Sequence, residues 1–377
     1  MSETAKLQSV DPINTMRSII QKIATGPELS KDISLEEARS GMRLILEKRV
    51  DPVQSAIYLI ALRMKRETDD ENIGVLDAIR EMTTIATASV DEVVDIADPY
   101  DGYLRNLPAS PFVPVVLAEC GVPAVIHGVD SVGPKYGVTH RKVFQAMDIP
   151  VDLSSEEAVA RINDPDIGWT YIDQKTFCPS LCDLVELRTL IVKRPVLTTV
   201  EVLAGPIRGE KKTHLVTGYV HKPYARLYAL LARHVGFDSG LIIRGMEGGV
   251  IPSLRKAGTM VYYHDMGPEQ SIEVSPSDLG IQQDIASAAI PEDIPKASKK
   301  KDEIAADIDV DAVAKVAAEE GIKALQGEKG PTRDGLIYSA ALCLWHVKKY
   351  DTLSASAQAV KEVLDSGKAH SRLGIDK

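Results

Sequence analysis

The sequence has little cysteine and few aromatic side chains, and it lacks long apolar runs. Four cysteines in 377 residues are too few for a disulfide scaffold, so the composition favours a reducing compartment. The first residues, MSETAKLQSV, contain no apolar core of a signal peptide, and no apolar run approaches the roughly 20 residues of a membrane span. We therefore expect a cytoplasmic protein that makes no membrane contact.

Basic charge is also in short supply. The chain has 44 Lys and Arg against 54 Asp and Glu, a net charge of −10, which disfavours wholesale coating of nucleic acid or of an anionic membrane. Hydrophobic residues are plentiful at 44%, an ordinary share for globular proteins. The length is sufficient for one large domain or two ordinary ones.

The first 90 residues carry repeated signals of helix starts. Ser34 with Glu37, and Thr68 with Glu71, fit capping boxes, in which two side chains satisfy two backbone N–H groups. Asp51 precedes a proline at a first helical position. These signals predict an all-helical N-terminal domain over residues 1–90.

After residue 90, β-branched runs alternate with helical stretches. The runs are EVVDIA, VPAVIHGV, HLVTGYV, SGLIIRG and TMVYYHD, and the clearest helix, PYARLYALLARHV, is closed by Gly236. This alternation predicts an α/β domain with a largely parallel sheet, which holds ligands at the C-terminal ends of its strands. Residues 282–310, with mixed charge and two prolines, predict a flexible insertion.

Three stretches, VPAVIHGVDSVGPKYG, TVEVLAGPI and EKGPTRDGLIYSAAL, carry a resemblance that extends over nearly the whole chain. The sequence resembles the anthranilate phosphoribosyltransferases, glycosyltransferases related to pyrimidine nucleoside phosphorylases. The resemblance implies a small helical domain, residues 1–90 with a contribution from 155–195, hinged to an α/β domain of residues 91–154 and 196–377. It also implies a homodimer formed through the N-terminal helices.

The family's glycine-rich diphosphate loop is altered here. Only Asp101 and Gly102 match it, in the stretch ADPYDG. Pro99 has no N–H to donate, and Asp98 adds negative charge where a polyanion is expected, at a cost of about 1–4 kcal/mol for a charge pair near 4 Å. Two interpretations stay open: a modified anion or metal site, and a scaffold turn whose ligand is gone.

A second family motif survives in part and supplies substrate contacts by resemblance. Its matching residues include four candidate binding residues, namely His127, Gly128, Ser131 and Lys135. Lys135 is the candidate phosphate contact, because an ammonium is a compact point charge. The resemblance implies that His127 serves the acceptor substrate.

The remaining site residues are also implied by the resemblance. Ser110 matches a serine near the metal, and Arg188 matches an arginine that binds the acceptor, where a guanidinium pairs with a carboxylate. Glu247 is the one carboxylate left of a magnesium-binding pair, because Gly248 stands in the second position. We expect a weakened Mg²⁺ site and no organic cofactor.

Two functions follow. The first is a divergent phosphoribosyltransferase that binds a phosphorylated sugar and uses an acceptor other than anthranilate. The second is a non-catalytic homologue that binds nucleic acid, or another ligand, on the same fold. The second would use a groove lined by seven basic residues: Arg63, Lys65, Arg66, Lys135, His140, Arg141 and Lys142. On local sequence alone, His140–Lys142 is interpreted as a solvated helix start.

Overall fold

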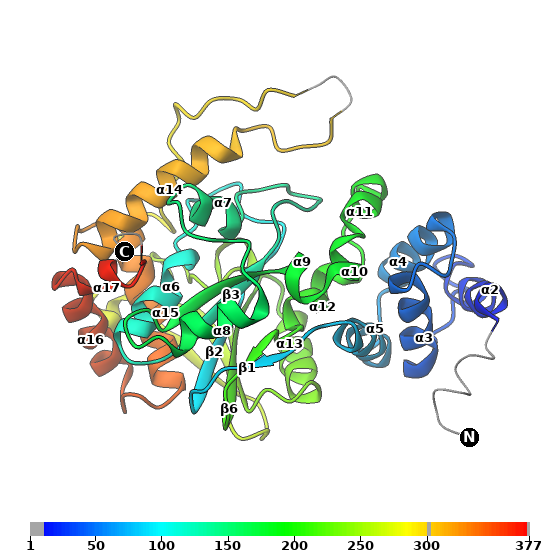
Figure 1. Cartoon of the computed structure of the whole chain (residues 1–377), viewed down its shortest axis with the longest axis horizontal. Coiled ribbons are helices and arrows are strands. Elements are labelled where there is room, and N and C mark those ends of the chain that lie inside the picture. The colour runs from blue at the N-terminus through cyan, green and yellow to red at the C-terminus, as the bar shows by residue number, and fades with distance from the viewer. Residues whose placement is uncertain (1–10, 300–302, 375–377) are drawn as a thin grey trace. The chain divides into compact units, whose positions relative to one another are not determined.

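The computed structural model describes residues 11–299 and 303–374, which form two compact units. Unit 1 comprises the chain up to Thr83 together with Cys178–Ala204, and unit 2 comprises Thr84–Phe177 and Gly205 onward. The segment 155–177, expected in the helical domain, lies in unit 2. The predicted fold class, a helical N-terminal domain and a larger α/β domain, is confirmed (Figure 1).

Unit 1 is helical because its sequence caps each long helix. Both predicted capping boxes are present, Ser34 with Glu37 and Thr68 with Glu71. Gly74 brings two helices together, since a Cβ there would lie 2.3 Å from the carbonyl oxygen of Leu35. The elements are α2 (Pro12–Ile23), α3 (Leu35–Leu46), α4 (Pro52–Lys65), α5 (Asp69–Glu81), α10 (Pro179–Cys182), α11 (Val185–Ile191), α12 (Leu197–Val200) and η2 (Glu201–Leu203).

Unit 2 is built on a seven-stranded sheet with the order β4-β3-β2-β6-β7-β8-β9. The first five strands are parallel, and β8 and β9 are antiparallel additions at one edge. The strands are β2 (Glu92–Ala97), β3 (Ala124–Gly128), β4 (Trp169–Asp173), β6 (Lys212–Tyr219), β7 (Ser239–Arg244), β8 (Gly258–Tyr263) and β9 (Gln270–Val274). A separate parallel pair joins β1 (Ala86–Thr87) to β5 (Ile207–Arg208).

The strand order reverses at β2. The chain runs from β2 to β3 and β4 on one side, and then from β6 to β7 on the other. Because parallel crossovers are right-handed, the helices of the two halves cover opposite faces of the sheet. The carboxyl end of β2 is therefore a topological switch point, where α/β proteins place ligands.

Helices and short turns complete unit 2. The crossover and loop elements are η1 (Ser110–Phe112), α6 (Val113–Glu119), α7 (His140–Gln145), α8 (Ser155–Asn163), α9 (Gln174–Phe177), α13 (Pro223–His234), η3 (Met246–Gly248) and η4 (Pro276–Leu279). The C-terminal helices are α14 (Val310–Leu325), α15 (Pro331–His346), α16 (Leu353–Asp365) and α17 (Lys368–Ser371). Strands β4 and β9 were not expected from the sequence.

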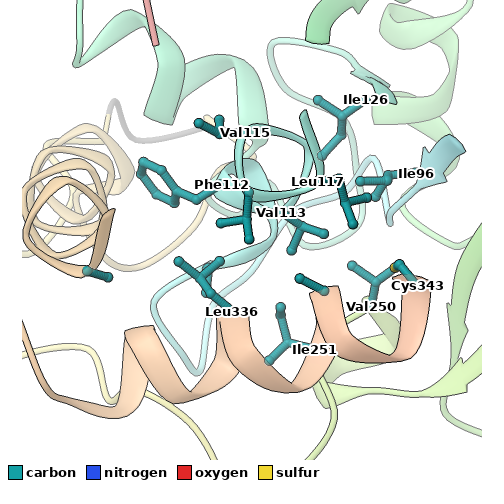
Figure 2. Packing of buried hydrophobic residues seen from close by; sticks show 14 of the residues in the cluster. Ile96, Phe112, Val113, Val115, Leu117, Ile126, Val250, Ile251, Leu336 and Cys343 are labelled. Carbon is teal, nitrogen blue, oxygen red and sulfur yellow. The ribbon is translucent and has the colours of Figure 1, made fainter. Parts of the chain in front are cut away.

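The main core lies between one sheet face and the C-terminal helices. Helix α6 packs against β3 and against α15, and Figure 2 shows its apolar side chains between the sheet and Leu336 of α15. Phe112 packs directly on α14, where a Cβ on Gly321 would lie 1.9 Å from the ring. Val250 and Ile251 belong to the same core, which fixes the loop after η3 close to β2.

The predicted insertion, residues 282–310, forms a long excursion that leads into α14 (Figure 1). Its described arms pair through Lys296 and Ile308, and the N–H of Leu107 donates to the carbonyl of Ala288 at 3.0 Å. Residues 300–302 lie outside the described part, and the flexibility of the segment stays a prediction. None of the helices in the described ranges combines the length and apolarity that membrane crossing requires.

Candidate functional site

The turn after β2 is the candidate site of unit 2, because it follows the switch strand. The N–H of Gly102 donates to the carbonyl of Pro99 at 3.2 Å and closes the turn. Tyr103 then pairs with Val138 through two backbone hydrogen bonds. The turn is thus clamped to the loop that follows β3.

Gly102 is required by this clamp. Its φ is +71°, and a Cβ would lie 2.6 Å from the carbonyl oxygen of Val138. Across the clamp, a Cβ on Gly137 would lie 2.6 Å from the backbone of Tyr103. Two glycines that match the family motifs therefore have a packing reason within unit 2.

Asp98 points into the protein and not towards a ligand. Its carboxylate accepts hydrogen bonds from the Ser110 hydroxyl at 2.6 Å, from His140 Nε2 at 2.8 Å and from the N–H of Val250 at 2.8 Å. The Tyr103 hydroxyl donates to it as well. Four donors stabilise the buried charge of Asp98, and its repulsion of a bound polyanion stays a prediction.

Electrostatics keep Asp98 ionised. Burial alone would raise the pKa of Asp98, but the hydrogen bonds and charge of His140 and the hydroxyls of Ser110 and Tyr103 outweigh burial and lower that pKa below its ordinary value. Burial and the neighbouring Asp98 raise the pKa of Tyr103. Ser110, predicted near a metal, is fully buried and belongs to this network.

A second set of polar contacts, separate from the network around Asp98, surrounds Glu247. Its Oε1 accepts hydrogen bonds from the main-chain N–H of Arg105 at 2.7 Å and of Leu104 at 3.1 Å, and from Asn106 Nδ2 at 3.2 Å. Lys135 Nζ lies 3.6 Å from Glu247 Oε2 and 3.1 Å from Asp101 Oδ1. Asp101, Lys135 and Glu247, all predicted as site residues, are thus brought together.

These carboxylates do not fit a magnesium ion as they are arranged. Mg²⁺ needs oxygen ligands with free lone pairs, whereas Glu247 faces N–H groups and Asp101 faces an ammonium. Within residues 11–299 and 303–374, no three Asp, Glu, His or Cys side chains form a group suited to a metal. In this structure Glu247 is a carboxylate bound by N–H donors, and its metal role stays a prediction.

His127, predicted as a substrate contact, lies in the interior of the sheet. Nε2 lies 2.8 Å from Asp95 Oδ1, and Nδ1 lies 2.5 Å from the Tyr100 hydroxyl. The side chain is fully buried, with Phe177 against its ring. Both ring nitrogens are engaged within unit 2, and the role of His127 as a substrate contact stays a prediction.

The other two residues of that motif lie at and just beyond the carboxyl end of β3. Gly128 ends β3, and a Cβ there would meet only the Tyr171 ring at 3.8 Å, so close packing does not demand glycine. Ser131 is half-buried in the loop that carries Lys135. Their roles as ligand contacts stay predictions.

Arg188, the predicted acceptor-binding residue, forms a buried ion pair inside unit 1. Its Nη1 donates to Glu201 Oε2 at 2.6 Å, and its Nη2 donates to Oε1 at 2.7 Å. Both side chains are 1% exposed. This bidentate pair uses the fork geometry by which arginine binds a carboxylate, and the acceptor-binding role of Arg188 stays a prediction.

The basic residues proposed for nucleic acid are largely compensated by acids. His140 and Arg141 are buried, which corrects the expectation of a solvated helix start. Arg141 Nη1 lies 3.0 Å from Asp173 Oδ2, and Lys142 Nζ lies 2.8 Å from Asp311 Oδ1. In unit 1, Arg63 pairs with Glu67, and Lys65 pairs with Asp32 and Glu71.

Sequence reasoning missed Glu201, and it did not connect His140 or Tyr103 with Asp98. One signal existed for Glu201, a charged residue inside the apolar stretch TVEVLAGPI, since such residues are seldom buried without a partner. Nothing local distinguishes His140 from a solvated histidine. Its partner Asp98 is 42 positions away in sequence.

Family comparisons cover most of the chain. Residues 17–83 match the glycosyl transferase family helical bundle domain, and residues 107–370 match the glycosyl transferase family a/b domain. These two matches correspond to the helical N-terminal region and to most of the α/β region.

Relatives of known sequence agree with these matches. An anthranilate phosphoribosyltransferase of Methanopyrus kandleri is 25% identical over 355 residues, 93% of this chain and 96% of the relative. One of Nitrobacter hamburgensis is 26% identical over 362 residues, 96% of this chain and 97% of the relative. An uncharacterized protein of Aquifex aeolicus is 29% identical over 252 residues, 67% of this chain and 74% of the relative.

Solved structures show the same fold. Anthranilate phosphoribosyltransferase from Thermus thermophilus has a TM-score of 0.71 at 18% identity, and the match covers 96% of this chain and 97% of that chain. The Saccharomyces cerevisiae enzyme in complex with PRPP and Mg has a TM-score of 0.72 at 15% identity, and the match covers 96% of each chain. The chain therefore shares its fold with these enzymes over nearly its whole length.

Proposed function

This chain belongs to the glycosyl transferase family with a helical bundle domain and an α/β domain that includes anthranilate phosphoribosyltransferases, and we propose that it transfers a ribose phosphate to an acceptor other than anthranilate. The donor half of the proposal is supported by the yeast relative that binds PRPP, the phosphoribosyl diphosphate. It is also supported by a cluster of N–H groups and Lys135 at the switch point of the sheet.

The Arg188–Glu201 pair carries the acceptor half of the proposal. A guanidinium whose two outer nitrogens already bind one carboxylate has lost its fork for a second. Anthranilate carries a carboxylate, which would have to displace Glu201 from a buried pair. An acceptor without a carboxylate at this position needs no such displacement.

The reaction is a displacement at the anomeric carbon of the ribose. The bond from that carbon to the diphosphate oxygen breaks, and the diphosphate leaves with the electron pair. A bond to the acceptor nitrogen forms, and the nitrogen releases a proton. The protein contributes by positioning the reactants and by stabilising the leaving charge, for which Lys135 and main-chain N–H groups are suited.

The donor half is tested by thermal unfolding of the whole chain with phosphoribosyl diphosphate, with and without Mg²⁺. A ligand at 100 times its Kd adds about 2.7 kcal/mol of stability. A raised Tm in either condition supports the proposal. An unchanged Tm at millimolar ligand in both conditions refutes it, and salt-sensitive retention on single-stranded DNA would then favour the nucleic-acid alternative.

The acceptor half is tested by incubating the protein with phosphoribosyl diphosphate and anthranilate. We expect mass spectrometry to detect no phosphoribosylated anthranilate, because the guanidinium of Arg188 is already paired with the carboxylate of Glu201. Turnover of anthranilate would contradict this half alone. Mass spectrometry of small molecules that copurify with the protein is the direct route to the acceptor.

We infer that the protein forms a homodimer through unit 1. Helix α4 presents an apolar stripe of four residues at helical spacing, namely Val53, Ile57, Ile60 and Met64. Val53 is 66% exposed and Met64 75% exposed. Large apolar side chains so exposed at both ends of one apolar stripe are typical of protein interfaces.

A further inference from the structure

Two consecutive main-chain N–H groups and one side-chain amide converge on a single point beside the switch strand. We name this group the 104–106 cradle, which consists of the N–H groups of Leu104 and Arg105 and the Nδ2 of Asn106. Successive N–H groups aimed at one point form an anion-binding concavity, and proteins use such concavities for phosphates. The cradle therefore has the chemistry of a phosphate site.

Glu247 fills this cradle. Its carboxylate accepts from all three donors, and its side chain is 8% exposed. The ammonium of Lys135 lies within ion-pair distance of both Glu247 and Asp101. A phosphate that approached the cradle would meet the same donors and the same ammonium, together with the negative charge of Glu247.

The backbone of Glu247 adopts a conformation uncommon for a residue with a side chain. Its φ is +52° and its ψ is 16°, inside the short turn η3. Neighbouring glycines make this turn sterically allowed, since a Cβ on Gly245 would lie 1.6 Å from the carbonyl oxygen of Gly249. The turn therefore holds Glu247 towards the cradle at some conformational cost, and the carboxylate's hydrogen bonds offset that cost.

We propose that Glu247 is an internal anion that closes the 104–106 cradle, and that a ligand bearing a phosphate or diphosphate group binds there by displacing the Glu247 side chain. The proposal deepens the proposed function and rests on it for the identity of the ligand. The gain on displacement comes from charge: a diphosphate offers more negative oxygens to the same donors and to Lys135 than one carboxylate does. The apparent affinity is reduced by the fraction of molecules in which Glu247 occupies the cradle.

The test is isothermal titration of the whole chain with inorganic diphosphate, in a buffer that contains a chelator and no divalent metal. The main variant is Glu247→Asn, because asparagine is uncharged and tolerates a positive φ better than most residues. We expect Glu247→Asn to bind diphosphate roughly tenfold more tightly than the unaltered protein, or better, since a negative charge is removed from beside the anion. Glu247→Asp keeps the negative charge at this position. Comparing its diphosphate affinity with that of Glu247→Asn separates the effect of the charge from that of the backbone conformation.

Glu273→Gln is the matched control. Glu273 lies on β9 of the same unit and is exposed, so removing its charge should leave diphosphate affinity unchanged. Far-UV circular dichroism checks that each variant folds. Should Glu247→Asn fail to fold, Glu247→Gln, which keeps the side-chain length, is titrated in its place with the same expectation.

Diphosphate affinity in Glu247→Asn no higher than in the unaltered protein overturns the proposal, and this includes the case in which neither binds. An equal gain in Glu273→Gln also overturns it, because the effect would then be one of net charge. The proposed function fails separately. Tight diphosphate binding by Glu247→Asn, without any stabilisation of the unaltered chain by phosphoribosyl diphosphate, would leave the internal anion in place and reject the donor substrate.

Discussion

Substitution of Glu201 by glutamine should strongly destabilise unit 1. The change removes the charge opposite a guanidinium that is 1% exposed, and it keeps the shape of the side chain. The Nε of Arg188 already has no hydrogen-bond partner among the described residues, so the pair with Glu201 is the main compensation for the buried charge. Breaking a buried pair from one side costs about 3–5 kcal/mol. Such a loss is a large part of the ~5–15 kcal/mol that stabilises a typical domain.

The measurement is urea unfolding followed by far-UV circular dichroism. Both tryptophans, Trp169 and Trp345, lie in unit 2, so their fluorescence follows that unit and serves as an internal reference. The helical signal of unit 1 should be lost at lower urea in Glu201→Gln, while the fluorescence transition stays near its original midpoint. Glu186→Gln, on an exposed position of helix α11, which carries Arg188, should change stability by no more than about 0.5 kcal/mol.

A double variant distinguishes a lost partner from lost volume. Replacing Arg188 by methionine and Glu201 by leucine removes both charges and keeps apolar bulk. We expect it to recover most of the stability lost in Glu201→Gln, since buried ion pairs are often replaceable by apolar residues at little cost. A loss below about 1 kcal/mol in Glu201→Gln would refute the reasoning. Such a small loss would mean that another group compensates the charge of Arg188. Glu201 could then give way to a substrate carboxylate.

Three further predictions concern assembly, acid sensitivity and packing. Ile57→Glu on α4 should convert dimers to monomers, as measured by size-exclusion chromatography with light scattering. The control Leu29→Glu changes an exposed residue of unit 1 outside the stripe and should leave dimers intact. A dimeric Ile57→Glu protein would count against the interface. Burial and nearby histidines lower the pKa of His346 well below 6.5, so the unfolded chain binds the proton first and stability falls as the pH drops below about 6.5. Urea midpoints across pH should show this fall, and it should shrink in His346→Gln; an equal slope in both proteins would show that other groups cause it. Gly321→Ala should lower the free energy of unfolding by about 1–3 kcal/mol, because the added methyl group overlaps the Phe112 ring. The control Gly330→Ala places its methyl group in open space and should leave the stability nearly unchanged. Equal stability of the two variants in thermal or urea unfolding would refute the packing argument.

Much of the fold was predictable because its signals are local. Capping at Ser34 and Thr68 depends on residues three positions apart, and both helices begin where predicted. The alternation of strands and helices likewise predicted the parallel sheet. Strand β4 was not among the predicted strands. Strand β9 was also missed, because its mixed polar sequence at the sheet edge carries a weak pattern.

The candidate site was less predictable, because its decisive contacts join distant parts of the chain. Glu247 accepts from an N–H that lies 142 positions away, and His140 meets Asp98 across 42 positions. A sequence motif shows which side chain is present, but it does not show which donor or acceptor that side chain binds in the folded protein. His127 and Arg188 both match the family, yet both are engaged by partners of the protein's own.

Residue identity and short spacing were enough to establish the family, the two kinds of domain and the loss of glycines from the turn after β2. These properties can be read without coordinates. Only the tertiary structure shows which groups pair with the charged side chains in and around that turn. Asp98 is buried among four donors, and the main-chain N–H groups of the 104–106 cradle hold Glu247. The physical reason is that a buried charge must find its counter-group in space, and folding brings that group from any part of the chain.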